Sequence, residues 1–185
     1  MAASGNNPRF EAVVVPHLDA AYNLARWLAR NADDAEDVVQ EAYMRALQYF
    51  GSFRGGDARP WLLAIVRKTC FTWLARNHPA EVRGGYDEDQ DSAAAWDAPT
   101  PLDPEAQALA NATRDSVNEA IAELPLAFRE VLVLRELEEL SYKEIAAIVG
   151  APIGTVMSRL SRARALLHRS PLLRDYARPA IGTPR

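Results

Sequence analysis

The sequence has a single cysteine, Cys70, among its 185 residues, so the chain can form no internal disulfide. Its three histidines are scattered, and no group of cysteines and histidines has the spacing of metal ligands, so we expect neither a metal nor another cofactor. No apolar run approaches the ~20 residues of a membrane span. The first residues also lack the basic and apolar regions of a secretory signal. These absences predict a cytoplasmic protein that makes no membrane contact of its own.

The motifs of common enzymes are missing as well, since there is no glycine-rich phosphate loop, nucleophile elbow or metal constellation. We therefore do not expect an enzyme. The net charge is −4, which disfavours a protein that binds DNA unaided, because phosphate neutralisation dominates non-specific affinity. The charge is uneven, however. Residues 58–78 and 152–170 contain basic residues and no acids, whereas residues 81–105 contain eight acids and one base. This pattern favours DNA contact made together with a larger partner.

Helical periodicity covers most of the first half. Apolar residues recur with a spacing of about 3.6 in Phe10–Arg30. A second helix is expected from Asn31 or Asp33 to Gly51, and a third after Asp57. Cys70 is expected to be a small core residue of the third helix. The other residues that this helix should bury are Trp61, Leu62, Ile65, Val66, Thr69, Trp73 and Leu74.

The second half predicts four helices, at about 105–124, 125–138, 141–149 and 153–168. Residues 79–104 combine acids, glycines and prolines, which is typical of a flexible, solvated linker. The tail, 171–185, contains three prolines and is expected to be loose. No strand is predicted. The sequence therefore indicates an all-α protein with two small helical domains, 8–78 and 105–170, joined by a flexible acidic linker.

A helix-turn-helix is predicted near the end of the chain. Ser141 and Glu144 have the spacing of a capping box, Gly150 supplies a left-handed residue, and Pro152 begins the next helix. That next helix, Ile153–Leu167, is basic, and in a helix-turn-helix the second helix enters the major groove of DNA. The alternative is an ordinary bundle, in which two amphipathic helices meet at a glycine turn and the basic face is solvated.

At this point the sequence resembles a known family. The second half is similar to region 4 of bacterial sigma factors in Leu124-Pro125, Arg129–Leu132, Leu140–Ala146, Gly154–Val156, Ser158–Leu160 and Arg162–Arg164. The first half is similar to region 2 of the same family in Asp34–Glu41, Phe53–Asp57 and Pro60–Leu62. The order of the two regions and the linker between them resemble an extracytoplasmic-function (group IV) sigma factor. The resemblance covers about residues 10–170.

The resemblance implies a function in transcription initiation and three kinds of partner. These are core RNA polymerase, through the clamp helices of its largest subunit and its flap region, promoter DNA, and an anti-sigma factor. The residues implied in clamp docking recur near one face of a helix, and they are Asp34, Asp37, Gln40 and Glu41. Alone, this pattern also fits a solvated face that favours the helix dipole. Val38, Ala42 and Leu47 are expected to face the core on another side.

The resemblance also implies two sets of promoter contacts. Opening of the −10 element requires cations along the single strand and platforms or pockets for bases, and the implied residues are Arg54, Asp57, Arg59, Arg67, Lys68 and Phe71. Many relatives carry asparagine in place of Lys68 and an acid in place of Thr72, which leaves the preferred −10 base open. For the −35 element, arginine can read guanine, and serine or threonine can contact base edges or phosphate. The implied residues are Thr155, Ser158, Arg159 and Arg162.

The main rival interpretation is a stand-alone helix-turn-helix regulator, since a region-4-like domain alone would look the same. A regulator with a receiver domain would need alternating strands and helices in the first half, and the sequence predicts helices there.

Overall fold

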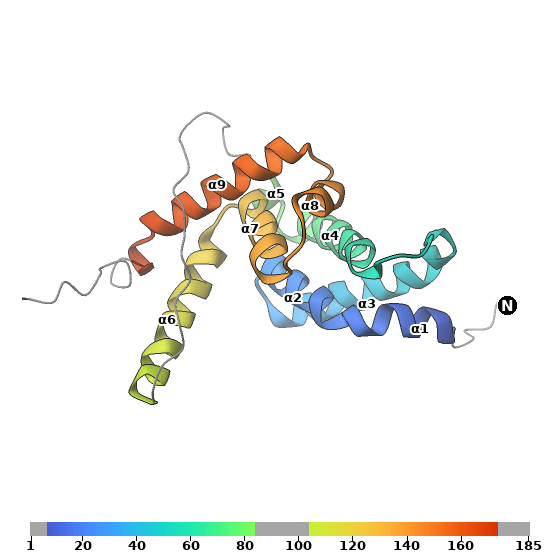
Figure 1. Cartoon of the computed structure of the whole chain (residues 1–185), viewed down its shortest axis with the longest axis horizontal. Helices are drawn as coiled ribbons and strands as arrows, with labels where there is room; N and C mark the ends of the chain where they lie inside the picture. Colours follow the sequence, from blue (N-terminus) through green and yellow to red (C-terminus); the bar gives the residue numbers. More distant parts are fainter. Residues whose placement is uncertain (1–6, 84–103, 174–185) are drawn as a thin grey trace, which may run out of the picture.

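The computed structural model describes residues 7–83 and 104–173, and every regular element in these two ranges is helical (Figure 1). This confirms the predicted all-α class. The predicted linker, 79–104, lies mostly outside the described residues. Its first residues form a short helix, α5 (Pro79–Arg83), and its last residue, Pro104, begins α6.

The starts of the helices in the first half follow from polar caps. The side chains of Asn7, Asn31 and Asp57 accept hydrogen bonds from backbone N–H groups two or three residues later, at 3.2, 2.8 and 2.9 Å. Such caps satisfy amides that a helix start otherwise leaves without a partner. The elements in order are α1 (Pro8–Val14), the 3₁₀ turn η1 (Val15–His17), α2 (Leu18–Ala29), α3 (Ala32–Tyr49), the 3₁₀ turn η2 (Phe50–Ser52) and α4 (Ala58–Asn77).

The predicted continuous helix Phe10–Arg30 is wrong in one respect, because the 3₁₀ turn η1 separates α1 from α2. Pro16 lies in this turn and has no N–H to contribute to an α-helical ladder. Arg30, in a left-handed conformation with φ of 62°, then ends α2. The start of α3 after Asn31 is as predicted.

The core of the first half is built around α4. Leu62, Val66, Thr69, Leu74 and Cys70 are buried, as predicted. The other predicted core residues, Trp61, Ile65 and Trp73, are half-buried and lie at the margin of the core. Their large side chains pack against the edge of the core. The ring centroids of Trp61 and Phe53 lie 5.2 Å apart.

The second half contains the predicted helices, with one interruption. Its elements are α6 (Pro104–Glu123), α7 (Leu126–Leu132), the π-helical turn η3 (Val133–Leu137), α8 (Tyr142–Val149), α9 (Ile153–Arg169) and the 3₁₀ turn η4 (Pro171–Leu173). The single helix expected over 125–138 is therefore an α-helix followed by a π-turn. The tail expected to be loose begins with η4, where Leu173 is buried, and its remaining residues, 174–185, lie outside the described ranges.

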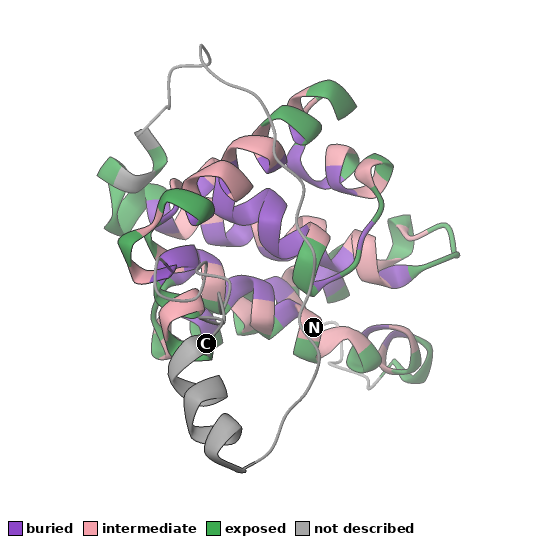
Figure 2. Cartoon of the chain, turned by 60° about the vertical axis from the view of Figure 1, so that its left-hand side comes forward, coloured by how far each residue is buried: buried purple, intermediate pink, exposed green. Residues whose placement is uncertain are grey.

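The two halves pack directly on each other. Helix α8 contacts α4, while α7 and η3 contact α2 (Figure 1). The buried residues of both halves join one hydrophobic cluster, and Figure 2 shows them on the facing sides of the helices. The sequence predicted the two halves but gave no sign of this contact. This contact between the halves determines the surroundings of many candidate site residues.

Candidate nucleic-acid and polymerase interface

The helix-turn-helix has the local geometry that the sequence predicts. The Glu144 amide donates to Ser141 Oγ at 3.3 Å, and the Ser141 amide donates to Glu144 Oε2 at 2.8 Å, which completes the capping box. The hydrogen bonds from Ser141 lower the pKa of the Glu144 carboxyl, because they favour its charged form. Gly150 ends α8 with φ of 68°, a conformation that costs glycine little.

Helix α9 buries one of its faces and leaves several residues near its N-terminus exposed. Val156 and Leu160 are buried against the rest of the second half, which fixes the rotation of the helix. Of the predicted −35 residues, Ser158 is exposed, whereas Thr155, Arg159 and Arg162 are half-buried. The apolar side chains of Ile153 and Met157 lie exposed in the same stretch, at 46% and 52%. The exposed surface at the start of α9 is thus a mixture of small polar and apolar groups.

The predicted −10 residues divide into exposed and occupied groups. Arg54 and Lys68 are exposed. Asp57 is exposed too, but its carboxylate caps α4 by accepting from the Arg59 amide. It follows the glycine pair Gly55 and Gly56, with φ of 86° and 88°, which turns the chain into the helix. Arg54 and Asp57 thus lie in the loop before α4, whereas Lys68 lies on α4 itself.

Arg67 belongs to the occupied group. Its Nε and Nη2 donate to the two carboxylate oxygens of Glu130, at 2.7 and 3.2 Å, in a bidentate pair between α4 and α7. Its guanidinium also lies over the ring of Phe71, 4.3 Å from the centroid. The one predicted −10 aromatic therefore has an arginine on its ring face.

Like its neighbour Arg129, Glu130 is almost completely buried, with only 1% of its surface exposed. Besides Arg67, it faces Arg159 of α9, whose Nη1 lies 3.8 Å from Glu130 Oε1. Burial raises the pKa of the Glu130 carboxyl, and the two guanidiniums offset only part of that effect. One carboxylate thus brings together Arg67, a predicted −10 residue, and Arg159, a predicted −35 residue.

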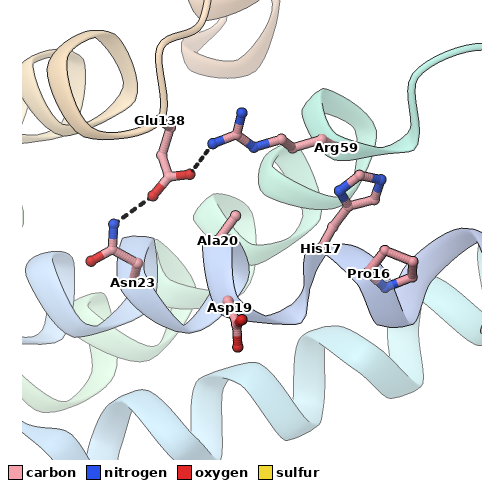
Figure 3. Close-up of a pocket in the computed structure, with 7 residues that line it drawn as sticks. All are labelled: Pro16, His17, Asp19, Ala20, Asn23, Arg59 and Glu138. Carbon is pink, nitrogen blue, oxygen red and sulfur yellow. Dashed lines mark hydrogen bonds and ion pairs between the residues drawn. The ribbon is translucent and has the colours of Figure 1, made fainter.

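A second buried acid, Glu138, lies just after the π-turn and joins the halves at another point (Figure 3). Its Oε1 accepts from Asn23 Nδ2 of α2 at 2.5 Å, and its Oε2 accepts from Nη2 of Arg59 in α4. These three residues line an open pocket of about 590 Å³ with Pro16, His17, Asp19 and Ala20. Arg59, a predicted −10 residue, is therefore held by an acid of the other half.

The acidic face of α3 is open. Asp37, Gln40 and Glu41 are exposed and Asp34 is half-buried, so the four predicted docking residues lie along the solvent side of the helix. Met44 continues the face with 55% of its surface exposed. Glu41 pairs with Arg45 of the same helix at 2.5 Å.

The sequence interpretation missed residues of this face and of the domain contact. Val38 and Ala42 are buried as expected, but Leu47 is 36% exposed, so its expected place in the core is wrong. Leu47 follows Gln40 at i+7 and Met44 at i+3, on the open side. Glu130 was also missed, although charged residues within the otherwise apolar run Phe128–Leu134 indicate buried, paired groups.

A second hollow lies within the second half. It has a volume of about 470 Å³ and is lined mainly by apolar side chains, with a pair between Arg164 and Glu136 at 2.5 Å among its lining. Leu137 in its wall is 44% exposed. The apolar lining residues are Val117, Ile121, Leu132, Val133, Leu137 and Leu167.

None of the described helices combines the length and apolar character that crossing a bilayer requires. The described residues also contain no group of three or more histidine, cysteine, aspartate or glutamate side chains placed to hold a metal ion.

The family models that match the chain are Sigma-70 region 2, over residues 13–79, and Sigma-70 region 4, over residues 114–167. Among curated proteins, the RNA polymerase sigma-H factor of Pseudomonas aeruginosa is 34% identical, with 92% of this chain and 91% of the relative covered. The ECF RNA polymerase sigma-E factor of Escherichia coli is 38% identical, with 76% of each covered.

Solved structures give the same result. The sigma factor RpoE, in complex with the anti-sigma factor NepR from Bartonella quintana, matches with a TM-score of 0.66 and 29% identity over 92% of this chain and 99% of RpoE. CnrH, in complex with the cytosolic domain of CnrY, matches with a TM-score of 0.61 and 26% identity over 95% of this chain and 93% of CnrH. The chain therefore belongs to the ECF sigma factors of RNA polymerase, the subunits that direct core polymerase to promoters.

Proposed function

We propose that this sigma factor acts in the cytoplasm, without catalytic chemistry of its own, and divides its contacts among three helices. Helix α3 docks on the clamp helices of the polymerase largest subunit. The loop before α4 and α4 itself contact the −10 element, and α9 reads the −35 element. The observation that carries this proposal is the geometry of the helix-turn-helix, whose second helix buries Val156 and Leu160 and leaves Ser158 exposed.

The docking face on α3 combines charge with exposed apolar surface. Asp37 and Gln40 lie beside Met44 and Leu47 on the solvent side, and mixed surfaces of this kind are typical of protein interfaces. Met44, 55% exposed, adds apolar contact surface to this face. We assign Asp34 and Glu41 to the edges of this face.

For the promoter contacts, we propose that Arg54, Lys68, Arg59 and Arg67 attract the single strand at the −10 element, while Phe71 offers a ring for stacking. Asp57 supports this set by capping α4. At the −35 element, we assign Thr155, Ser158, Arg159 and Arg162 to base edges and phosphates in the major groove.

Two further contacts are proposed, one with the polymerase flap region and one with an anti-sigma factor. The apolar hollow of the second half is large enough to accept apolar side chains, and we propose that the polymerase flap region docks there. Because RpoE and CnrH were solved in complexes with NepR and CnrY, we also propose that an anti-sigma factor binds this chain.

The test is run-off transcription with core polymerase over a library of genomic fragments, followed by extraction of the shared motif. Initiation at fragments with two separated conserved elements, only in the presence of both the chain and polymerase, is the expected result. Tight, sequence-specific DNA binding by the chain alone, without polymerase-dependent initiation, would instead identify a stand-alone regulator.

A further inference from the structure

We propose that Met157, with Ile153 beside it, selects thymine at one position of the −35 element by packing against the C5-methyl group of the base. The inference rests on the −35 contact of α9 proposed above. It goes further than that contact, because it assigns a base to two side chains that lack the strong hydrogen-bonding groups of their polar neighbours.

Ile153 and Met157 form one apolar patch at the start of α9. They are four residues apart in a helix, so their side chains are neighbours on its surface. Each exposes about half of its surface, whereas Val156 and Leu160 of the same helix are buried in the core. Successive residues of a helix are turned by about 100°. Met157 therefore leads from the buried side of α9 to the exposed side, on which Ser158 lies.

The surroundings of this apolar patch fit a polyanion. Residues 152–170 contain four arginines and no acid, and a surface with one sign of charge attracts a partner of the opposite sign. Pro152 and Gly154, on either side of Ile153, are exposed and have no polar side chain. In a helix-turn-helix, the N-terminal residues of the second helix contact base edges in the major groove. The apolar patch lies at this end of α9.

The major groove offers one apolar group to such a patch. Each base pair presents hydrogen-bond donors and acceptors there, and thymine adds a methyl group at C5. The thioether of methionine is only a weak acceptor, so Met157 cannot read a donor and acceptor pattern as arginine or asparagine does. Its unbranched side chain adapts well to apolar contacts. The thymine methyl group is therefore the feature of DNA that the apolar patch fits.

This contact predicts a preference that depends on a methyl group and not on base pairing. Deoxyuridine pairs as thymidine does and presents the same O4 acceptor, but it lacks the methyl group. Loss of one methyl group from an apolar contact should weaken binding about fourfold. A C5-methylated cytosine carries a methyl group at the same ring position. Methylation of a cytosine placed there should therefore strengthen binding by a similar factor.

The experiment measures the affinity of the holoenzyme for a labelled promoter from the run-off library, at one fixed salt concentration. Each thymine of the −35 element, on either strand, is replaced in turn by deoxyuridine. The proteins are the full wild-type chain and its variants Met157→Ala, Met157→Gln and Ile153→Ala. Val15→Ala is the matched control, because Val15 is an exposed apolar residue of η1 that lies outside every proposed contact.

The wild type and Val15→Ala should bind about fourfold more weakly when deoxyuridine replaces one particular thymine. Met157→Ala and Met157→Gln should bind the thymine and deoxyuridine promoters equally, and Ile153→Ala should retain part of the difference. With cytosine at the same position, the wild type should prefer the C5-methylated base, whereas the Met157 variants should not distinguish the two.

Equal affinity of the wild type for thymine and deoxyuridine at every −35 position would overturn the proposal. A deoxyuridine effect that persists in both Met157 variants would overturn it as well, since another residue would then contact the methyl group. If both variants lose the capture of core polymerase in a pull-down while circular dichroism shows intact helices, the apolar patch contacts protein instead of DNA, which also rejects the proposal.

A failure of the −35 contact itself has a different signature. If scrambling the −35 element leaves polymerase-dependent initiation unchanged, α9 does not read that element, and that part of the proposed function fails. If initiation needs the −35 element but is indifferent to its methyl groups, the proposed function stands and only the thymine contact is rejected.

Discussion

The acidic face of α3 and the basic faces of α4 and α9 are in opposite states in the same structure. On α3, Asp37, Gln40 and Glu41 are exposed. On α4 and α9, Arg59, Arg67 and Arg159 pair with Glu130 of α7 or with Glu138, just after η3. The proposed docking surface is thus exposed, while much of the proposed promoter-contacting surface is paired with carboxylates.

This difference gives a physical account of the order of events. A chain with a net charge of −4 gains little from non-specific DNA attraction, and its own carboxylates reduce that gain further. Docking of α3 needs no rearrangement of these pairs. We expect polymerase binding to precede promoter binding.

The largest effect is expected from removal of the open surface. Asp37→Ala combined with Gln40→Ala should weaken capture of core polymerase about 100-fold, if each lost contact contributes roughly 1.4 kcal/mol. The measurement is a pull-down titration, with circular dichroism to check helicity. The matched control is Asp115→Ala with Asn118→Ala, an exposed acid and amide at the same spacing on α6. Undiminished capture would remove α3 from the docking surface.

On the basic side, Arg162→Ala should lower transcription through weaker −35 recognition. Loss of a good base contact costs about 2 kcal/mol, or roughly 30-fold in binding. The comparison is run-off transcription at promoters with intact and scrambled −35 elements. Arg169→Ala, at the exposed end of the same helix, is the control. An equal defect on both promoters would mean that Arg162 contacts phosphate or packs within the protein.

The free energy of unfolding should depend on pH through the buried carboxyl of Glu130. Burial raises the pKa of this carboxyl above its ordinary value of 4.5, so the folded chain binds a proton more tightly than the unfolded chain. Between the two pKa values the folded state therefore holds more protons, and its free energy of unfolding falls as the pH rises through that window.

Glu130→Gln should remove this contribution, so that the variant gains stability relative to wild type as the pH rises. The measurement is urea unfolding between about pH 4.5 and pH 8. Glu139→Gln, at the exposed neighbour, provides the baseline for loss of one charge. If wild type and Glu130→Gln show parallel pH profiles, Glu130 does not titrate differently in the folded state.

The smallest effect is expected at Lys68, which is exposed on α4. A lysine acts as a point charge, whereas an asparagine both donates and accepts. Lys68→Asn should shift the preference at one −10 position by about threefold and reduce the salt dependence of open-complex formation by about one phosphate contact. Selection from a randomised −10 element at two salt concentrations measures both. Identical motifs and salt slopes would show that Lys68 does not touch the promoter.

The local parts of this structure could be read from the sequence because local rules fix them. The caps at Asn31, Asp57 and Ser141 and the turn at Gly150 depend on residues within one helical turn. The break at Pro16 was missed because a strong apolar stripe runs through it. For the site residues, the sequence predicted which helices carry the charged side chains.

Pairing across the halves lay beyond the sequence interpretation. Glu138 and Asn23 are separated by 115 positions, and no periodic pattern links them. Residue chemistry also does not state whether an arginine meets a phosphate or a carboxylate, since both accept the same bidentate hydrogen bonds. Arg59 and Arg67 fit both descriptions, and only the packing of the two halves decides which partner they have in this form.

The packing of the two halves depends on the π-turn at Val133–Leu137, because this turn sets the rotation of the residues that follow it. The Glu138 amide donates to the Val133 carbonyl, five residues back, at 3.0 Å, where an α-helix would use four. Such a turn is equivalent to one inserted residue, and an insertion rotates everything after it by about 100° around the helix axis. Deletion of one residue from this turn would restore a regular helix and carry the Glu138 carboxylate away from Asn23. The contact between the two halves therefore depends on the number of residues in this turn.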